Sequence, residues 1–286
     1  MRAYGHTLRR LAPAVLASAL LLTVSEAAYP QQATTPKPEQ TTPGSDTSTQ
    51  ASARAILMRM ADFLGNASAF GVNVRSGYDA VQASGQKIEF GELRKITVSR
   101  PDRMRVESEL SNGARIQTVF TGKETTVIDF ANNVYAQEPQ SGNLDETIVH
   151  FVRDLHMRFP LAMLLVSRLP AELNERVRQV DYVEKTNIQG IPAHHLAARG
   201  DTVDFQVWVA DGSQPYPVRV VLTYKREPGQ PQFWAQFSDW SFTPSITPDT
   251  FVALPPAGAQ KIAFAAELRS ASPEARKASS AKGAKK

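Results

Sequence analysis

The fold of this chain is decided by residues 201–242, DTVDFQVWVADGSQPYPVRVVLTYKREPGQPQFWAQFSDWSF. Three segments of this stretch alternate apolar and polar residues, and two runs rich in proline and glycine separate them. Alternation with period two predicts strands that bury one face, and short turns predict antiparallel pairing. The apolar residues that share a face are Val203, Phe205, Val207, Val209, Val218, Val220, Leu222, Tyr224, Phe233, Ala235 and Phe237. The stretch therefore predicts three neighbouring strands of an antiparallel sheet.

Further strands and helices are expected before this stretch. A helix is expected over Ala51–Leu64, where apolar residues recur at helical spacing. Eight more segments are predicted as strands: 69–81, 86–99, 103–110, 115–121, 125–130, 134–137, 177–187 and 193–198. The period changes in the middle of the chain, so Leu144–Phe159 and Leu161–Leu169 are predicted as helices that Pro160 separates. We predict an α+β, mainly β fold, in which a large antiparallel sheet curls and the helical insert covers its concave face.

The two ends of the chain differ in composition from its middle. Residues 2–27 place arginines before the apolar run Leu11–Val24, which is typical of a secretory signal peptide, and cleavage after Ala27 is expected. The alternative is an uncleaved anchor helix, but the apolar run is shorter than the roughly 20 residues that a membrane span requires. Residues 28–50 and 266–286 predict a disordered linker and a disordered basic tail on either side of one folded domain, residues 51–265.

The absence of cysteine and the distribution of charge limit which cellular compartments and which classes of partner fit this chain. The chain has no cysteine, which excludes disulfides, thiolate metal sites, a cysteine nucleophile and a lipid-modified N-terminal cysteine. We therefore predict an exported periplasmic protein that is not a lipoprotein. The formal net charge of +4 comes from the two ends, and the residues between them are slightly acidic. This distribution does not favour nucleic-acid binding, and a peripheral membrane contact through the basic tail is the most that we expect.

Candidate catalytic and metal-binding groups do not form a convincing pattern. Neighbouring residues of a strand point to opposite faces, so His194 and His195 do not converge on one metal ion. Glu107 and Glu109 share a strand face with nearby arginines, which is typical of a solvated, ion-paired surface. The sequence has neither a nucleophile elbow nor a phosphate loop. We predict a protein that is not an enzyme, with no catalytic residue, metal site or cofactor; a hydrolase is the lowest-ranking alternative.

Several segments, in order along the chain, resemble one known family. They are RPDRMRVE (100–107), TVIDFANNVYA (126–136), FPLAMLL (159–165), DFQVWVADGSQPYPVRVVLTYK (204–225), FWAQFSDWSF (233–242) and ITPDTFVALPPAGAQKIAF (246–264). The chain resembles DUF2092, a family of predicted periplasmic proteins related to the outer-membrane lipoprotein carriers of the LolA and LolB kind, over about residues 51–265. The resemblance implies a half-open β-barrel whose concave apolar side is covered by helices. In the carriers that cavity receives acyl chains. This chain is longer than a carrier at both ends, and the receptor contacts of the carriers have no counterpart that we can place on it.

A hydrophobic ligand cavity is the site that we predict. A curved sheet does not close on itself with short side chains, so either helices or a ligand fill its concave side. The candidate lining residues lie on both halves of the sheet and on the insert: Phe70, Phe90, Met104, Val106, Phe120, Ile128, Phe130, Phe205, Val207, Val220, Leu222, Phe233, Phe237, Phe151, Leu155, Met163, Leu164 and Leu165. The simpler interpretation is that these residues form an ordinary core. Opening is expected to come from movement of the insert, residues 144–176.

The tryptophans leave a second interpretation open. Trp234 and Trp240 share the parity opposite to Phe233 and Phe237, and Trp208 shares the parity of its polar neighbours. Such rings either form a contact patch for a partner or a membrane, or pack beneath the proline-rich segment 244–256, which we favour. Our main prediction is a non-enzymatic periplasmic protein that binds a hydrophobic or lipid-like ligand, such as an acyl chain, between sheet and helices. The alternative is a regulatory interaction module that binds a periplasmic protein or peptide.

Overall fold

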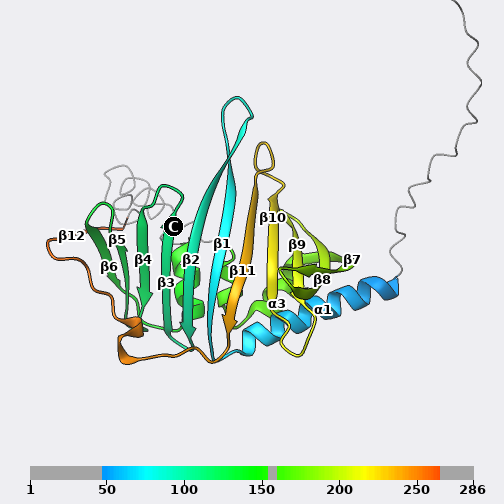
Figure 1. Ribbon diagram of the computed structural model, residues 1–286, viewed down its shortest axis with the longest axis horizontal. Coiled ribbons are helices and arrows are strands. Elements are labelled where there is room, and N and C mark those ends of the chain that lie inside the picture. Colours follow the sequence, from blue (N-terminus) through cyan, green and yellow to red (C-terminus); the bar gives the residue numbers. More distant parts are fainter. Residues whose placement is uncertain (1–46, 154–159, 265–286) are drawn as a thin grey trace, which may run out of the picture. The chain divides into compact units, whose positions relative to one another are not determined.

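Figure 1 shows the computed structural model of the protein, which describes residues 47–153 and 160–264. Within these residues, twelve strands form one sheet in the order β12-β6-β5-β4-β3-β2-β1-β11-β10-β9-β8-β7. The strands are β1 (Ala69–Val81), β2 (Lys87–Ser99), β3 (Arg103–Leu110), β4 (Arg115–Phe120), β5 (Glu124–Asp129), β6 (Val134–Pro139), β7 (Val177–Ile188), β8 (Ile191–Gly200), β9 (Val203–Ala210), β10 (Pro217–Tyr224), β11 (Gln232–Ser241) and β12 (Gln260–Ile262). Neighbouring strands are antiparallel, except that β12 pairs with β6 in parallel.

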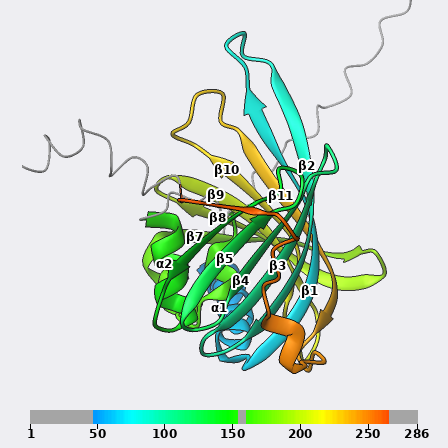
Figure 2. The same cartoon turned by 90° about the vertical axis from the view of Figure 1, so that its left-hand side faces the viewer.

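Helices lie against one face of this sheet. The helices are α1 (Thr47–Asn66), α2 (Leu144–Arg153) and α3 (Leu169–Arg176), and the 3-10 turns are η1 (Ala162–Leu165) and η2 (Pro248–Phe251). Figure 2 shows the sheet curled around α1 and α2. The turn η1 contacts all three α-helices, so these four segments form a single cover. We call the covered side of the sheet the concave face and the other side the outer face.

The predicted fold class is confirmed. All eleven predicted strands are present, and the antiparallel sheet is curved and covered by helices. The strand β12 was not predicted, because its three exposed residues show no alternation and its partner β6 is distant in sequence.

The predicted helix over Leu161–Leu169 is wrong. That segment forms the four-residue turn η1, and a separate helix, α3, begins at Leu169 and continues to Arg176. Leu161, directly before η1, has a left-handed φ of 65°, which no α-helix contains. The apolar composition of the segment predicts burial, but it does not select regular helix geometry. Part of the other predicted helix, residues 154–159, lies outside the described residues.

Cross-strand pairing places the apolar residues of the concave face in continuous rows. One row crosses six strands through Phe90, Tyr78, Phe233, Leu222, Phe205 and Ala198. The helix α1 covers this face with five residues that are at most 2% exposed: Ala53, Leu57, Met60, Ala61 and Leu64. Helices and sheet therefore share one hydrophobic core.

The parity expected for Trp240 is wrong. A register shift between β1 and β11 falls between the pairs Gly71–Ser241 and Asn73–Ser238, and Asp239 has a φ of 54°. The extra residue moves every later side chain of β11 to the other face. Trp240 consequently lies on the concave face, where its ring stacks on Phe237 at 5.8 Å between centroids.

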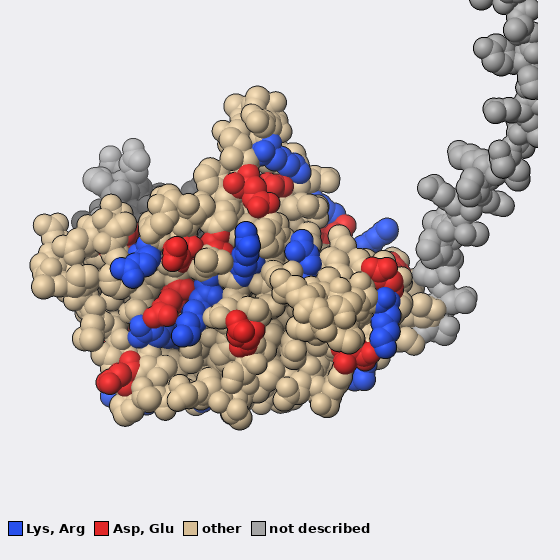
Figure 3. All heavy atoms as spheres, in the orientation of Figure 1, with Lys and Arg blue, Asp and Glu red and all other residues tan. Residues whose placement is uncertain are grey.

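The outer face is covered by cross-strand side-chain pairs and by the C-terminal segment. On β3, Arg105 pairs with Glu107 at 2.7 Å and also donates to the backbone carbonyl of Thr250 in η2. Figure 3 shows basic and acidic side chains interspersed on the side that it presents. Mixed charge of this kind is an ordinary solvated surface. No helix in the described part of the chain is long and apolar enough to span a bilayer.

Aromatic rings on the outer face are covered by neighbours on adjacent strands. His195 of β8 stacks on Trp208 of β9 at 4.0 Å, and the Arg219 guanidinium lies over both Trp208 and Trp234, at 5.7 and 5.4 Å from the ring centroids. The indole N–H of Trp234 donates to Glu89 at 2.9 Å. Each ring thus has a stacking or hydrogen-bonding partner within the sheet, which stabilises strand pairing without a ligand.

Candidate functional site

A small apolar cavity lies between η1 and the concave face. Its volume is about 20 Å³, which is room for a single water molecule. It is lined by Phe70, Val72, Val74, Arg94, Ile96, Pro160, Leu161, Leu164, Leu165, Phe233, Phe237 and Trp240. The wall formed by β1, β2 and β11 is continuous sheet, whereas the opposite wall is the short η1 segment. At this volume the cavity has no room for an acyl chain unless η1 moves.

The η1 segment is weakly built as a local structure. It has four residues, and no side chain caps its start at Leu161. A leucine in the left-handed region costs about 1–2 kcal/mol, so surrounding contacts must hold it there. Of its four residues, Ala162 and Leu165 are buried, whereas Met163 and Leu164 remain partly exposed. The segment depends on anchors outside itself.

The main anchor is Arg100, at the end of β2. Its guanidinium donates to the backbone carbonyls of Leu64 and Ala67, at the end of α1, and to that of Leu165 in η1. It also lies over the Phe70 ring, 5.5 Å from the centroid. Burial lowers the pKa of Arg100, and the nearby Asp145 carboxylate partly opposes this effect. One desolvated side chain thus joins the sheet, α1 and η1.

A second set of contacts holds the other end of the insert. The Asp145 carboxylate of α2 accepts hydrogen bonds from the Ser167 N–H at 2.9 Å and the Ser167 hydroxyl at 2.7 Å. His150 of α2 approaches Glu138 of β6 at 3.6 Å. Gly65 at the end of α1 lies so close to the backbone carbonyl of Ser167 that a Cβ there would approach it to 2.7 Å. These polar and close backbone contacts add to the apolar packing of the insert, whose Leu144, Phe151 and Leu169 are about 1% exposed in the common core.

The structure brings many of the predicted lining residues to the interior. Those that are buried in the same core are Phe70, Met104, Val106, Phe120, Phe151, Leu165, Val207, Val220, Phe233 and Phe237. Those that pack against it while partly exposed are Met163, Leu164, Phe205 and Leu222. Within this set, the cavity itself is lined by Phe70, Leu164, Leu165, Phe233 and Phe237. The remaining members are core residues around it.

Two of the predicted lining residues lie on the wrong side of the sheet. Ile128 pairs with Gln117, which pairs with Glu107, and this row belongs to the outer face. Phe130 lies beneath the Arg115 guanidinium at 5.4 Å, also on the outer face. The prediction failed because an apolar residue of a strand was assigned to the concave side, whereas Ile128 is buried on the outer face.

Two other predicted residues have different outcomes. Phe90 has the parity of the concave face, but it is 42% exposed and stacks on Tyr78 at 5.8 Å in the β1–β2 hairpin. It therefore lies beyond the helical cover, outside the cavity. Leu155 falls outside the described residues.

The sequence missed several groups that line the cavity, above all Arg94 and Trp240. Arg94 has the parity of Ile96 and Val98, and this was the available signal, because a charged residue in phase with core residues is unusual. Trp240 could not be found by parity, because a bulge reverses it.

Polar side chains away from the cavity form hydrogen bonds with neighbouring strands of the sheet. His194 contacts Tyr182 and Asp211, whereas His195 contacts Gln206, so the two histidines have separate partners. Among the described residues, no group of three or more histidine, cysteine, aspartate or glutamate side chains is placed to hold a metal ion.

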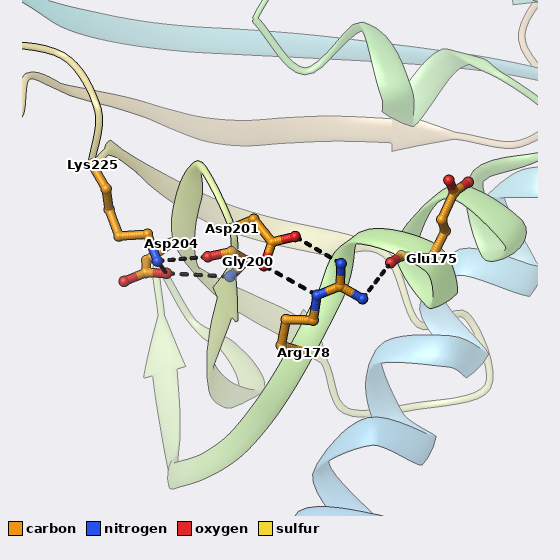
Figure 4. Close-up of polar contacts among 6 residues, drawn as sticks. All are labelled: Glu175, Arg178, Gly200, Asp201, Asp204 and Lys225. Carbon is orange, nitrogen blue, oxygen red and sulfur yellow. Dashed lines mark hydrogen bonds and ion pairs between the residues drawn. The ribbon is translucent and has the colours of Figure 1, made fainter.

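An exposed ion-paired cluster closes one end of strands β7 to β10. Figure 4 shows Arg178 between Asp201 and the backbone carbonyl of Glu175, and Lys225 beside Asp204 and Gly200. The hydrogen bond from Arg178 and its positive charge hold the pKa of Asp201 below its usual value. Both side chains are more than half exposed, so the pair contributes little to stability.

These features define a half-barrel protein with a concave apolar face that a long helix and shorter helical segments cover. The sequence matches, over residues 53–265, the DUF2092 family, described as predicted periplasmic protein. The chain belongs to this family, as its sequence segments indicated.

Solved structures with a similar arrangement have low sequence identity. The lipoprotein LppX of Mycobacterium tuberculosis is 13% identical with a TM-score of 0.44, covering 69% of this chain and 99% of that chain. LprF of Mycobacterium bovis is 12% identical with a TM-score of 0.46, covering 71% and 98%. The LolA superfamily protein NE2245 of Nitrosomonas europaea is 11% identical with a TM-score of 0.34, covering 70% and 97%. The comparison with curated proteins found no match.

Proposed function

We propose that this protein binds an apolar, lipid-like ligand between η1 and the concave face of the sheet, and that it does so without catalysing a reaction. The observation that carries the proposal is the asymmetry of the cavity walls. The sheet wall presents Phe70, Phe233 and Phe237. Among the described residues, the opposite wall consists of Pro160, Leu161, Leu164 and Leu165, and the first three are partly exposed. A ligand gains access when η1 moves away, and its chain then takes the place of the leucines.

The energetics set a minimum length for such a ligand. Each methylene group that leaves water contributes about 0.8 kcal/mol, and exposing one leucine costs at most about 1.5–3 kcal/mol. Moving Leu161, Leu164 and Leu165 away therefore costs at most about 4.5–9 kcal/mol, which a chain of roughly six to eleven methylenes offsets. Longer chains leave a net gain, so affinity should rise with chain length above that threshold.

The anchors of η1 indicate how opening is controlled. The sheet does not have to change. Among the described residues, the Arg100–Leu165 and Asp145–Ser167 hydrogen bonds join η1 and its flank to the rest of the cover, beside the close approach of Gly65 to Ser167. Breaking these few hydrogen bonds costs about 0.5–1.5 kcal/mol each, and bonds to charged groups somewhat more. The cost is of the size that binding of a long chain supplies.

The cellular compartment of the protein is part of the same proposal. The family description supports a periplasmic protein, and we propose that residues 2–27 are the export signal and that cleavage follows Ala27. We further propose that residues 51–265 form the binding domain between two tails.

The test is native mass spectrometry of the protein purified from a periplasmic extract, alone and with fatty acids and fatty alcohols of matched lengths. The intact mass shows where the chain begins, and a one-to-one adduct that strengthens with chain length supports ligand binding. Leu164→Glu places a charge in the cavity wall and should abolish the adduct while circular dichroism keeps the strand signal.

The matched control is Leu93→Glu, because Leu93 is 52% exposed on the outer face. That variant should bind like the natural protein. If Leu164→Glu unfolds, Leu164 is an integral core residue and η1 is not a removable cover.

A second candidate function is binding of a protein or peptide partner. It is favoured by the exposed apolar side chains of the β1–β2 hairpin, Tyr78, Ile88 and Phe90, which are 44%, 39% and 42% exposed. A ligand-free mass that no amphiphile changes would favour this function, and Phe90→Ser should then reduce capture of the partner in a periplasmic pull-down.

A further inference from the structure

The strand β2 carries an ion pair on the concave face, beside the apolar cavity. Glu92 and Arg94 of β2 form two hydrogen bonds, from Nε to Oε1 at 2.7 Å and from Nη2 to Oε2 at 2.5 Å. Their side chains are only 12% and 11% exposed. Burying two charges is costly, and an apolar pair of similar size would usually serve stability as well. The pair therefore calls for a reason other than stability.

Among the described residues that line the cavity, Arg94 is the charged one. The other lining residues, among them Val74, Leu161 and Phe237, are apolar. Arg94 pairs with Val74 across the strands, and Val74 pairs with Phe237, so the guanidinium lies in a row of the cavity wall. A planar guanidinium binds a carboxylate through two parallel hydrogen bonds.

Glu92 lies one row nearer to the solvent. It pairs with Ser76, and the next row outward holds Phe90 and Tyr78, which are 42% and 44% exposed. Rotation of Glu92 toward the hairpin would bring its carboxylate into water, whereas Arg94 faces the closed cavity. The Arg94 guanidinium is desolvated, so an anion that takes the place of Glu92 would keep its charge compensated.

We propose that the ligand is an amphiphile with a carboxylate head group, which pairs with Arg94 in place of Glu92. Its chain runs past Val72 and Phe70 toward Trp240, between η1 and the sheet. Glu92 acts as the internal stand-in for the head group and keeps Arg94 paired while the site is closed. This inference rests on the proposed ligand-binding function and names the class of its ligand.

Trp240 provides a direct reporter of this arrangement. The sequence has three tryptophans, and Trp208 and Trp234 lie on the outer face. In a background of Trp208→Phe and Trp234→Phe, the remaining fluorescence comes from the cavity wall. Bromostearic acid and bromostearyl alcohol quench a tryptophan that their chains touch, and they differ only in the head group.

The expected result is quenching by both ligands, with the carboxylate bound about tenfold more tightly than the alcohol. Arg94→Met should abolish this preference and leave binding of the alcohol nearly unchanged. Glu92→Gln should tighten binding of the carboxylate severalfold, because a neutral amide competes less well for the guanidinium. Lys95→Met, which removes an exposed cation from the outer face of the same strand, should change neither affinity.

Different failures have different meanings. If neither ligand quenches Trp240 and neither forms an adduct, the proposed function itself fails. If both bind equally, or if the preference for the carboxylate survives in Arg94→Met, ligand binding stands and the role of Arg94 is overturned. Weaker carboxylate binding by Glu92→Gln would overturn the view of Glu92 as a stand-in, since removal of a competitor cannot weaken binding.

Discussion

The helix α1 and the turn η1 cover the same concave face, but they are attached to it differently. Leu57, Met60 and Leu64 of α1 are at most 2% exposed and belong to the common core. In η1, Leu165 is buried, whereas Leu164 is only partly so. The helix is fixed by its own apolar stripe, and the turn is fixed by Arg100 and by other groups outside it.

The difference follows from length. A helix of 20 residues places an apolar residue on one face at every turn, so its burial is repeated and cooperative. A 3-10 turn of four residues has no such repeat. Segments with few buried apolar contacts open first, before the sheet and the long helix. We therefore expect α1 to behave as a permanent wall and η1 as a removable cover.

The largest expected effect is a difference in the free energy of unfolding between variants of α1 and of η1. Leu64→Ala should lower the free energy of unfolding by about 2–5 kcal/mol, because it leaves a cavity in the core. Leu164→Ala should cost about 1 kcal/mol, because that side chain is already partly in water. Urea denaturation, followed by circular dichroism, measures both values. Equal losses would show that η1 is as integral to the core as α1.

An intermediate effect is expected from Arg100→Met. The change leaves the carbonyls of Leu64, Ala67 and Leu165 without this donor, but it also removes a desolvated charge, so the net loss of stability should be about 1–3 kcal/mol. Hydrogen exchange should become faster in η1 well before it does in the strands.

The matched control for this variant is Arg103→Met, because the Arg103 side chain is 54% exposed. Its exchange pattern should resemble that of the natural protein. If Arg100→Met instead loosens the sheet and η1 together, Arg100 is a general core contact and not an anchor of the cover.

The smallest effect concerns the exposed cluster of Figure 4, which belongs to neither cover. Arg178 holds the pKa of Asp201 below its usual value, so the ionised carboxylate stabilises the folded state above the unfolded-state pKa of about 3.9. This contribution is lost as the pH falls through the lower, folded-state pKa. Asp201→Asn should therefore lower the urea midpoint slightly at pH 7 and leave it unchanged in strong acid.

Asp62→Asn, on the exposed side of α1, serves as the control for that measurement. A loss for Asp201→Asn that persists in strong acid would show that the pair acts through hydrogen-bond geometry and not through the charge of Asp201.

Much of the fold followed from local pattern. The strands β9, β10 and β11 alternate so regularly that most of their inner faces were predicted up to Phe237. Val218 is an exception, because a register shift between Pro217 and Arg219 places it in a separate cluster with Ala193 and Ala210. Prediction failed at Asp239, where a bulge residue reverses the alternation of inward and outward side chains. It also failed at Ile128, which is buried on the outer face. It also failed for Leu161–Leu169, where an apolar composition gives no information about which backbone geometry buries it.

The candidate site was predictable only in part. Phe233, Phe237, Leu164 and Leu165 were found because apolar residues in phase with a strand or on an apolar insert are expected inside. Arg100 was not found, because its three acceptors are the backbone carbonyls of Leu64, Ala67 and Leu165. Every residue has such a carbonyl, so the sequence does not mark these three.

The sequence by itself determined the elements that depend on local repetition: the alternating strands, the amphipathic helices, and the segments that identify the family. The tertiary structure alone decided which side chains lie together inside the curved sheet. The bulge at Asp239 brings Trp240 into the cavity, and pairing between β1 and β2 sets Arg94 in its wall. The physical reason is that side-chain period is a property of neighbouring residues, whereas register, bulges and the contacts of a short turn depend on partners distant in sequence.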